Sequence, residues 1–399
     1  MNDTVQSDAR EEQRLFLESV DKYLGSQKTA KPLAPGEPAR HNPAQWAEMA
    51  AMGWLGLGLP EAAGGFLGTA EVNLLFEKWG STLLTAPLLD NLVLCGPLLA
   101  HYGSSAQQAV AADMVQGNRL LALALFEPQN RYDWHLPLSS IAVAGPPDAP
   151  AGWTLTGRKA RVASAADATH LLVLVRDDAA PSRAGEGLSL LLLPQNTPGI
   201  GQRNYRSYDD CAYSDIQFGA VAIAPGDFVG PRGQGRAMLA RAMDSAYIAL
   251  AAQAAGAMQS ACQLTIDYAK TRKQFGRVLS SNQAYQHALV DLYVAVEEAK
   301  ALVREANHHL AQAQRSNKPA DIQTASRWAS AAKAFTASEG RMVGEQSVQL
   351  HGAIGMTQDY AVGGYYKRLA ALANHYGDAE WHGLRIRDLD TEHPDGNTA

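Results

Sequence analysis

Two short stretches of the chain combine an arginine, several glutamines and a glycine in a pattern suited to binding a phosphate-bearing ligand. Their polar side chains are Arg272, Gln274 and Gln283 in the first stretch and Gln349 in the second. A guanidinium offers a planar fork of donors that matches a pyrophosphate, and glutamine amides add neutral hydrogen bonds. Gly352 follows Gln349 closely and lets the backbone approach a ligand because it has no side chain.

The surrounding sequences are Thr271-Arg-Lys-Gln-Phe-Gly276 and Gln349-Leu-His-Gly-Ala-Ile-Gly355. They resemble the two flavin-binding motifs in the C-terminal helical domain of acyl-CoA dehydrogenases. The resemblance implies FAD as the cofactor, an acyl-CoA thioester as the substrate and an electron-transferring flavoprotein as the redox partner. It implies FAD contacts from Arg272, Gln274, Phe275, Gln283, Gln349 and Gly352. Phe275 is equally suited to the core of the helical domain.

A dehydrogenase of this family needs a carboxylate that removes a proton from the α-carbon of the thioester. At the two positions where the family carries this base, the chain has Tyr376 and Ala246. The nearest carboxylates are Asp378 and Asp244, and both are candidates for a relocated catalytic base. A helix cap or a solvated surface position would explain each of them as well.

Histidines supply two further candidates for proton transfer. His351 and His382 have the right chemistry, but a single histidine in a helical domain is usually a packed or capped residue. The adjacent His308 and His309 point to different helix faces and have no further ligand one helical turn away. We therefore expect no metal site.

The middle of the chain has lost the groups that would contact a flavin ring. The family's "T-E-P-x-x-G-S-D" element appears as Phe126-Glu-Pro-Gln-Asn-Arg-Tyr-Asp133, so Phe126 and Tyr132 replace the two hydroxyl donors. In the strand that follows, Arg161 and Ala163 replace an aromatic ring and a threonine. The chain therefore lacks most of the residues that the family places around the ring.

In this family two neighbouring subunits share each cofactor site. The motifs that this chain retains come from one of these subunits, and the motifs that it has lost come from the other. In the family oligomer, one subunit faces the flavin ring with its β domain and base, and the neighbouring subunit binds the ADP end. This chain keeps the residues used for the neighbour's flavin. Its variant motifs are most similar to those of the small subunit of pimeloyl-CoA dehydrogenase and of heteromeric steroid-degrading acyl-CoA dehydrogenases. The resemblance implies a base-lacking subunit that joins a second acyl-CoA dehydrogenase subunit in an α2β2 assembly acting on bulky or dicarboxylic acyl-CoA.

Two other functions are compatible with the same residues. A homo-oligomeric dehydrogenase would use a relocated base such as Asp244. A flavin-free scaffold or acyl-CoA-binding subunit would explain Phe126, because a bulky ring at that position can block entry of the flavin.

The composition predicts a globular protein with neither a nucleic acid nor a membrane as its partner. The chain has 399 residues, 46% of them hydrophobic and 19% charged, and a net charge of −6. The acidic balance and the lack of a basic stripe argue against nucleic acid. The longest uncharged run, 245–266, contains glutamines and predicts a buried helix rather than a membrane span. Three scattered cysteines and an N-terminus without an apolar core predict a reduced, cytoplasmic protein.

Three blocks of different periodicity organise the chain. Residues 1–118 read as an N-terminal helical domain, 119–234 as a middle antiparallel β-barrel domain, and 235–388 as a C-terminal four-helix bundle. The polar tail, 389–399, is expected to be disordered. This α+β multidomain layout is the acyl-CoA dehydrogenase fold that the resemblance implies.

Local signals place the elements inside these blocks. Asn42-Pro43 is typical of a helix N-terminus, and apolar residues alternate at spacings of 3 and 4 from Leu289 onward, as a bundle helix requires. Arg203 and Arg206 are expected in a loop before the last strand, where they are either an exposed pair or contacts for a CoA phosphate or substrate carboxylate. The strand-like runs are 120–126, 153–156, 170–175, 188–193 and 214–218.

Overall fold

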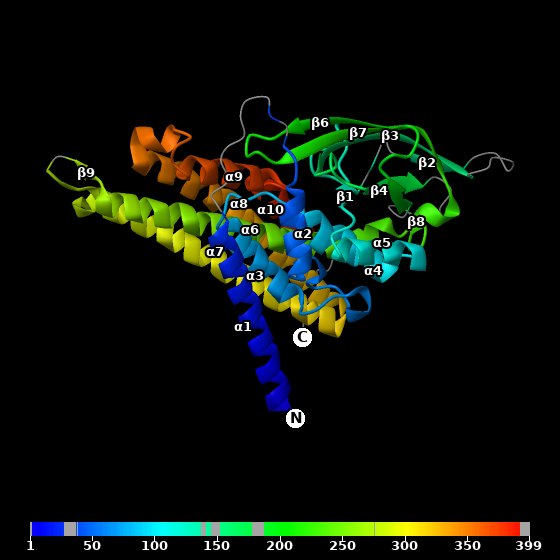
Figure 1. Cartoon of the computed structure of the whole chain (residues 1–399), viewed down its shortest axis with the longest axis horizontal. Coiled ribbons are helices and arrows are strands. Elements are labelled where there is room, and N and C mark those ends of the chain that lie inside the picture. The colour runs from blue at the N-terminus through cyan, green and yellow to red at the C-terminus, as the bar shows by residue number, and fades with distance from the viewer. Residues whose placement is uncertain are drawn as a thin grey trace. The chain divides into compact units, whose positions relative to one another are not determined.

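The chain forms two compact units, each built from separate parts of the sequence. The computed structural model describes residues 2–27, 37, 39–135, 137, 141–144, 152–177, 187–274 and 276–391 (Figure 1). We call the first unit, residues 1–32, 69–84 and 247–399, the helical unit. The second, residues 33–68 and 85–246, is the sheet unit. The N-terminal block thus contributes helices to both units.

Long helices make up the helical unit. They are α1 (Asn2–Ser26), α3 (Thr69–Gly80), α6 (Gly235–Thr271, which begins in the sheet unit), α7 (Gln283–Ser316), α8 (Pro319–His351), α9 (Val362–Asn374) and α10 (Ala379–Thr391). α8 packs against α7, α9 and α10. Described residues between 235 and 391 thus form five α-helices where four were expected, because the last helix of the bundle is broken before α10. Residues 389–391, expected in the tail, belong to α10, and 392–399 lie outside the described residues.

The apolar stripe predicted from Leu289 onward lies on the buried face of α7. Of the predicted stripe, Leu289 is partly buried, and the other members are buried: Leu292, Val296, Ala299, Val303, Ala306 and Leu310. The uncharged run 245–266 lies within α6 and is largely buried, so the prediction of a tightly packed helix is confirmed. Among the described helices, none is long and apolar enough to cross a membrane.

Glycines allow α3 and α6 to cross at short distance. A Cβ atom added at Gly256 would lie 1.9 Å from the carbonyl oxygen of Glu77, and one added at Gly80 would lie 1.9 Å from that of Gln253. No side chain fits into such a contact, so the crossing requires glycine on both helices. It holds α3 against α6, whose C-terminal end leads to Arg272.

The sheet unit is built on an eight-stranded mixed sheet. Its strands are β1 (Leu121–Ala124), β2 (Ile141–Ala144), β3 (Trp153–Ala163), β4 (His170–Asp177), β5 (Leu188–Pro194), β6 (Ile200–Arg206), β7 (Ala212–Ile223) and β8 (Phe228–Val229). The order is β6-β7-β3-β2-β4-β5-β8, with β1 beside β4. β1 and β2 both run parallel to β4, so the expectation of an antiparallel sheet is wrong at these two pairings. Long connections, rather than hairpins, separate β1 and β2 from β4, and such connections permit parallel pairing.

Four of the predicted strand-like runs lie in β3, β4, β5 and β7, and the run 120–126 contains the shorter β1, whereas β2, β6 and β8 were missed. β6 lacks the expected apolar alternation because its side chains from Gly201 to Tyr205 are exposed. Arg203 and Arg206 therefore lie on a strand, and their placement in a loop was wrong. Arg203 pairs with Asp215 at 2.7 Å and Arg206 with Asp210 at 3.6 Å, so both are engaged in ion pairs.

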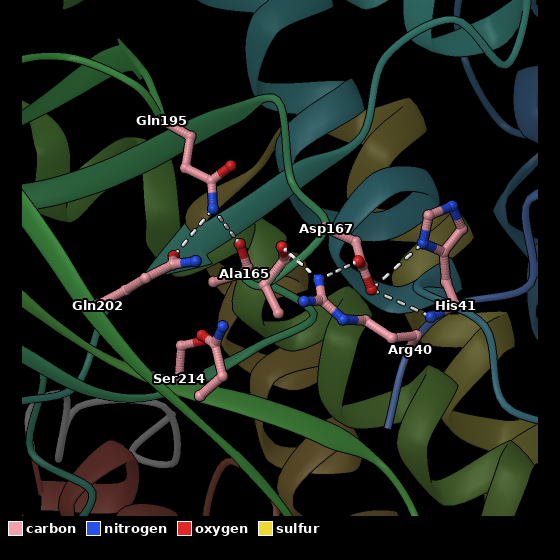
Figure 2. A network of polar contacts seen from close by, with 9 residues as sticks. Arg40, His41, Ala165, Asp167, Gln195, Gln202 and Ser214 are labelled. Carbon is pink, nitrogen blue, oxygen red and sulfur yellow. Dashed lines mark hydrogen bonds and ion pairs between the residues drawn. The ribbon is translucent and has the colours of Figure 1, made fainter. Parts of the chain in front are cut away.

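Polar contacts tie the segment before α2 (Pro43–Ala51) to the rest of the sheet unit (Figure 2). Arg40 Nη1 donates to Asp167 Oδ1 at 2.7 Å, and the His41 backbone N–H donates to Oδ2 at 3.0 Å. Burial opposes ionisation of Asp167, but the hydrogen bonds from Arg40 and His41 outweigh it and lower its pKa. Asn42 then caps the first turn of α2, as predicted.

A buried amide joins β1 to the helices that precede it. These are a π-helical segment (Leu89–Cys95), α4 (Gly96–Tyr102) and α5 (Ser105–Val115). The Asn91 side chain accepts from the Leu121 N–H at 2.9 Å and donates to the Leu121 carbonyl at 3.2 Å. Both backbone groups at the start of β1 are therefore satisfied by one side chain of the π-helical segment.

Candidate cofactor site

The first predicted FAD-binding stretch forms a hairpin between two long helices. β9 (Lys273–Gln274) and β10 (Arg277–Val278) pair after the end of α6, and a short 3-10 turn leads into α7. Arg272 lies at the base of this hairpin, Gln274 lies in β9, and Gln283 is the first residue of α7. Figure 1 shows the hairpin projecting from one end of the α6–α7 pair. The predicted Phe275 contact falls on a residue outside the described part of the chain.

The second predicted stretch lies at the same end of the helical unit. Gln349 is in the last turn of α8, and Gly352 begins a 3-10 segment, Gly352–Met356. The hydroxyl of Tyr285, in the first turn of α7, donates to the Leu350 carbonyl at 3.2 Å. This contact joins the start of α7 to the end of α8 and brings the two sequence stretches together.

The donors of this site are open to solvent. The side chains of Arg272, Gln274, Gln283 and Gln349 are all exposed. Gly352 has a φ of +66°, and a Cβ atom there would meet nothing within 4 Å. A guanidinium, amides and an uncovered glycine turn fit an anionic nucleotide end, so these residues would hold the ADP part of FAD.

His351, which immediately precedes Gly352, packs against two aromatic rings. The buried ring of His351 stacks on Tyr268 at 4.5 Å between centroids and lies 4.9 Å from the ring of Tyr360. His351 Nδ1 is 2.7 Å from the Ser347 carbonyl oxygen. Burial lowers the pKa of His351, although the Ser347 carbonyl opposes this. His351 is therefore a packed, neutral residue beneath Gly352, which is the simpler of its two sequence interpretations.

A strained turn occupies the position where the family carries its base. Tyr376 has a φ of +58°, unusual for a residue with a side chain, and its ring is buried against His375. Asp378 Oδ1 accepts a hydrogen bond from the Trp381 N–H at 2.9 Å and so caps the first turn of α10. The geometry gives Asp378 a structural role, and its role as a relocated base stays a hypothesis.

A buried lysine beneath this turn was not identified from the sequence. Lys333, on α8, is 1% exposed and donates to the Gly377 carbonyl oxygen at 2.7 Å. Burial lowers the pKa of Lys333 to about 7, although the Asp378 carboxylate opposes this. Beside it, His382 is fully buried, and burial together with the charges of Lys333 and Arg385 holds its pKa well below the usual range. In the sequence, Lys333 differs from other lysines only in that it stands within an alanine-rich helical stretch.

The titration of Lys333 should appear in the pH dependence of stability. The unfolded chain holds the lysine proton up to a pH of about 10.4, whereas the folded protein releases it near pH 7. Between these two pH values the unfolded state binds one more proton than the folded state, so the free energy of unfolding rises with pH by about 1.4 kcal/mol per pH unit. Urea unfolding at pH 7, 8 and 9 should show a shallower rise for Lys333→Met than for the unchanged protein. If the free energy of unfolding rose equally with pH in Lys333→Met and in the unchanged protein, this prediction would be contradicted. Lys367→Met, on an exposed residue of α9, is the matched control.

The second predicted base region lies on the part of α6 that belongs to the sheet unit. Asp244 is 5% exposed and Ala246 is fully buried. Asp244 is thus shielded from solvent in this chain, whereas the predicted cofactor donors are exposed. The catalytic role of Asp244 also stays a hypothesis.

An arginine–aromatic stack fills the positions where the family places its hydroxyl donors to the flavin ring. Phe126 and Tyr132 are buried, at 8% and 6% exposure. The guanidinium carbon of Arg161 lies 5.6 Å from the centroid of Phe126 and 5.9 Å from that of Tyr132. Arg161 Nη2 donates to the Arg131 carbonyl at 2.5 Å, and the Arg161 N–H donates to Asp215 Oδ1 at 3.2 Å. We call Phe126, Tyr132 and Arg161 the ring-position stack.

A buried ion pair between Lys159 and Glu127, the residue that follows Phe126 in the sequence, supports the ring-position stack. Lys159 Nζ donates to Glu127 Oε1 and to the Leu125 carbonyl, both at 3.1 Å, and neither charged side chain is more than 1% exposed. Burial lowers the pKa of Lys159 to about 8, although Glu127 opposes this. The Ala160 N–H donates to the Phe126 carbonyl at 2.8 Å. β3 therefore holds Phe126 in place by side-chain and backbone contacts that the sequence did not reveal.

Comparison with known proteins agrees with this architecture. Family models for the acyl-CoA dehydrogenase N-terminal, middle and C-terminal domains match residues 10–117, 122–221 and 233–388. The chain is 25% identical over 340 residues to the 3-(aryl)acrylate reductase of Clostridium sporogenes, which covers 84% of this chain and 86% of that protein. It is 25% identical over 344 residues to the short-chain specific acyl-CoA dehydrogenase of Homo sapiens, with 84% and 80% covered.

A solved structure extends the similarity over nearly the whole chain. The Tcur3481-Tcur3483 steroid ACAD matches with a TM-score of 0.76 and 27% identity, over 98% of both chains. The order of helical, β and helical domains, the exposed arginine and glutamine donors and the three family matches lead to one conclusion. This chain is a member of the acyl-CoA dehydrogenase family.

Proposed function

We propose that the chain is the base-lacking subunit of a heteromeric, FAD-dependent acyl-CoA dehydrogenase and that it completes the FAD site of its partner subunit. One contrast carries the proposal. The donors suited to the ADP end of FAD are exposed together at one end of the helical unit. The positions that the family uses around the flavin ring are instead filled by the ring-position stack, in which the rings of Phe126 and Tyr132 are buried and Arg161 is exposed.

Each cofactor residue has a defined part in this proposal. Arg272 binds the pyrophosphate through its guanidinium, and Gln274, Gln283 and Gln349 add neutral hydrogen bonds. Gly352 leaves its turn uncovered, so that backbone groups can approach the ligand. When bound, FAD supplies the hydride acceptor for α,β-dehydrogenation of an acyl-CoA thioester.

The partner subunit supplies what this chain lacks. A carboxylate base must come from the partner because Tyr376 and Ala246 occupy the two family positions. The similarity to a protein described as a steroid ACAD supports a bulky acyl-CoA as the substrate and an α2β2 assembly. Electron-transferring flavoprotein is the proposed redox partner. The three free cysteines agree with the reducing cytoplasm, which we propose as the compartment.

Two alternatives are each favoured by one observation. The ring-position stack favours a flavin-free scaffold or acyl-CoA-binding subunit, because it leaves Phe126 fixed where a small hydroxyl would stand. The burial of a carboxylate, Asp244, beside a lost base position favours a homo-oligomeric dehydrogenase with a relocated base. The exposed set of Arg272 and the glutamines opposes the scaffold, since a scaffold does not need donors for a pyrophosphate.

The amount of flavin per chain distinguishes these functions. We would record the visible absorption spectrum of the chain purified alone and after co-expression with a second acyl-CoA dehydrogenase subunit. The proposal predicts a colourless chain alone and one FAD for each pair of subunits in the complex. One FAD per chain in the isolated protein would refute it in favour of the homo-oligomer. A colourless complex would favour the scaffold.

A further inference from the structure

The hairpin places a second arginine beside the predicted cofactor residues. Arg277 lies directly opposite Gln274 in the β9–β10 pair, and the Leu279 N–H donates to the Arg272 carbonyl at 3.0 Å, which continues the same register. Residues opposite one another in an antiparallel pair project from the same face, and neighbours along a strand alternate. Arg272, Gln274 and Arg277 therefore share one face of the hairpin, and Lys273 belongs to the other.

A neighbouring amide fixes the position of Arg277. Its Nη2 donates to Asn282 Oδ1 at 2.5 Å, and Asn282 immediately precedes Gln283. The Asn282 side chain makes no capping bond to α7, so it is used to hold the arginine instead. A guanidinium that is already ordered loses less side-chain entropy when a ligand binds.

The two arginines of this face, Arg272 and Arg277, have no carboxylate partner in the described part of the chain. Both side chains are exposed on the same projecting hairpin. Two guanidiniums on one face match a ligand with two adjacent negative charges better than a ligand with a single charge.

We infer that Arg277 is a second phosphate-binding residue, which together with Arg272 binds the two negative charges of the FAD pyrophosphate. The inference rests on the proposed function, because it adds a residue to the same cofactor site. It assigns Gln274, between the two arginines on the shared face, to a neutral hydrogen bond at the same group. Lys273 has the same charge but projects from the opposite face and takes no part.

The test compares Arg277→Gln with Lys273→Gln in the assembly that carries flavin. Both variants remove one positive charge from the same hairpin. The FAD dissociation constant, measured by flavin fluorescence, should rise about tenfold for Arg277→Gln and less than twofold for Lys273→Gln. Raising the salt concentration should reduce the difference in FAD dissociation constant between Arg277→Gln and the unchanged protein. Riboflavin has no pyrophosphate, so its binding should not change in Arg277→Gln.

The possible outcomes separate this inference from the proposed function. Equal FAD affinities in Arg277→Gln and Lys273→Gln, with weaker binding in Arg272→Ala, would overturn the role of Arg277 alone. Equal weakening of FAD and riboflavin in Arg277→Gln would mean a distorted hairpin and would also overturn it. Arg277→Lys, which keeps the charge but loses the fork, should retain part of the affinity. If Arg272→Ala leaves FAD binding unchanged, the proposed cofactor site fails as well.

Discussion

Replacing Arg272 by alanine is expected to raise the dissociation constant of FAD by about 10- to 100-fold. A fork of charge-assisted hydrogen bonds to a phosphate contributes about 1.5–3 kcal/mol, and about 1.4 kcal/mol corresponds to a factor of ten. The Arg272 side chain is exposed and makes no hydrogen bond or ion pair within the described residues. Its removal should therefore affect the ligand and leave the fold stable. Fluorescence titration of the flavin-carrying assembly would measure the change.

Lys270→Ala is the matched control for this prediction. Lys270 is exposed in the last turn of α6 and carries the same charge, but it lies outside the hairpin. Its replacement should change the FAD dissociation constant less than twofold. Arg272→Lys should give an intermediate value because the ammonium keeps the charge and loses the planar fork. If Arg272→Ala retained FAD as tightly as Lys270→Ala, the cofactor would bind elsewhere or not at all.

Replacing Arg232 by alanine should lower the free energy of unfolding by about 3–5 kcal/mol. Arg232 donates from Nε and Nη2 to the buried carboxylate of Asp177 at 2.8 and 2.6 Å. Its guanidinium carbon also lies 4.5 Å from the ring centroid of Trp153 and 4.8 Å from that of Phe228. The alanine variant would leave Asp177 buried without this counter-charge and would lose both ring contacts. Urea unfolding followed by circular dichroism would measure the loss.

Arg203→Ala is the control for the pair of Arg232 with the buried Asp177. Arg203 also pairs with a carboxylate, Asp215, at 2.7 Å, but its side chain is 81% exposed. An exposed ion pair contributes only about 0–1 kcal/mol, so its removal should have a small effect. The double variant Arg232→Met with Asp177→Asn should regain much of the stability, because no charge then remains uncompensated. Equal losses for Arg203→Ala and Arg232→Ala would contradict the importance of burial here.

Local signals predicted the helical part of the fold well. The alternating spacing of 3 and 4 from Leu289 identified the buried face of α7, because one side of a helix repeats with that period. Asn42-Pro43 identified the start of α2, because capping and the fixed φ of proline act within one turn. β6 could not be found in this way. Its residues do not alternate between polar and apolar, and only pairing with β7 makes it a strand.

The candidate site also has features that local sequence patterns predicted and features that they could not predict. The arginine, glutamine and glycine motifs could be recognised from sequence because each lies in one continuous stretch, and the structure brings the two stretches together through Tyr285 and Leu350. The contact of Arg161 with Phe126 could not be predicted, because the two residues are 35 positions apart in the sequence and meet only through the pairing of the sheet. The same is true of Lys333 and the Gly377 carbonyl, which meet only when α8 packs against the turn before α10.

The sequence by itself determined the family, the order of helical, β and helical blocks, and the residues suited to the ADP end of FAD. All of these depend on residue types and on spacings within a few turns or strands. The tertiary structure alone decided that those donors are exposed at one end of the helical unit and that Arg161 covers the rings of Phe126 and Tyr132. It also decided that Lys159 and Lys333 are buried. Exposure, stacking and the pKa of a buried lysine depend on atoms contributed by distant parts of the chain, and no local pattern specifies those atoms.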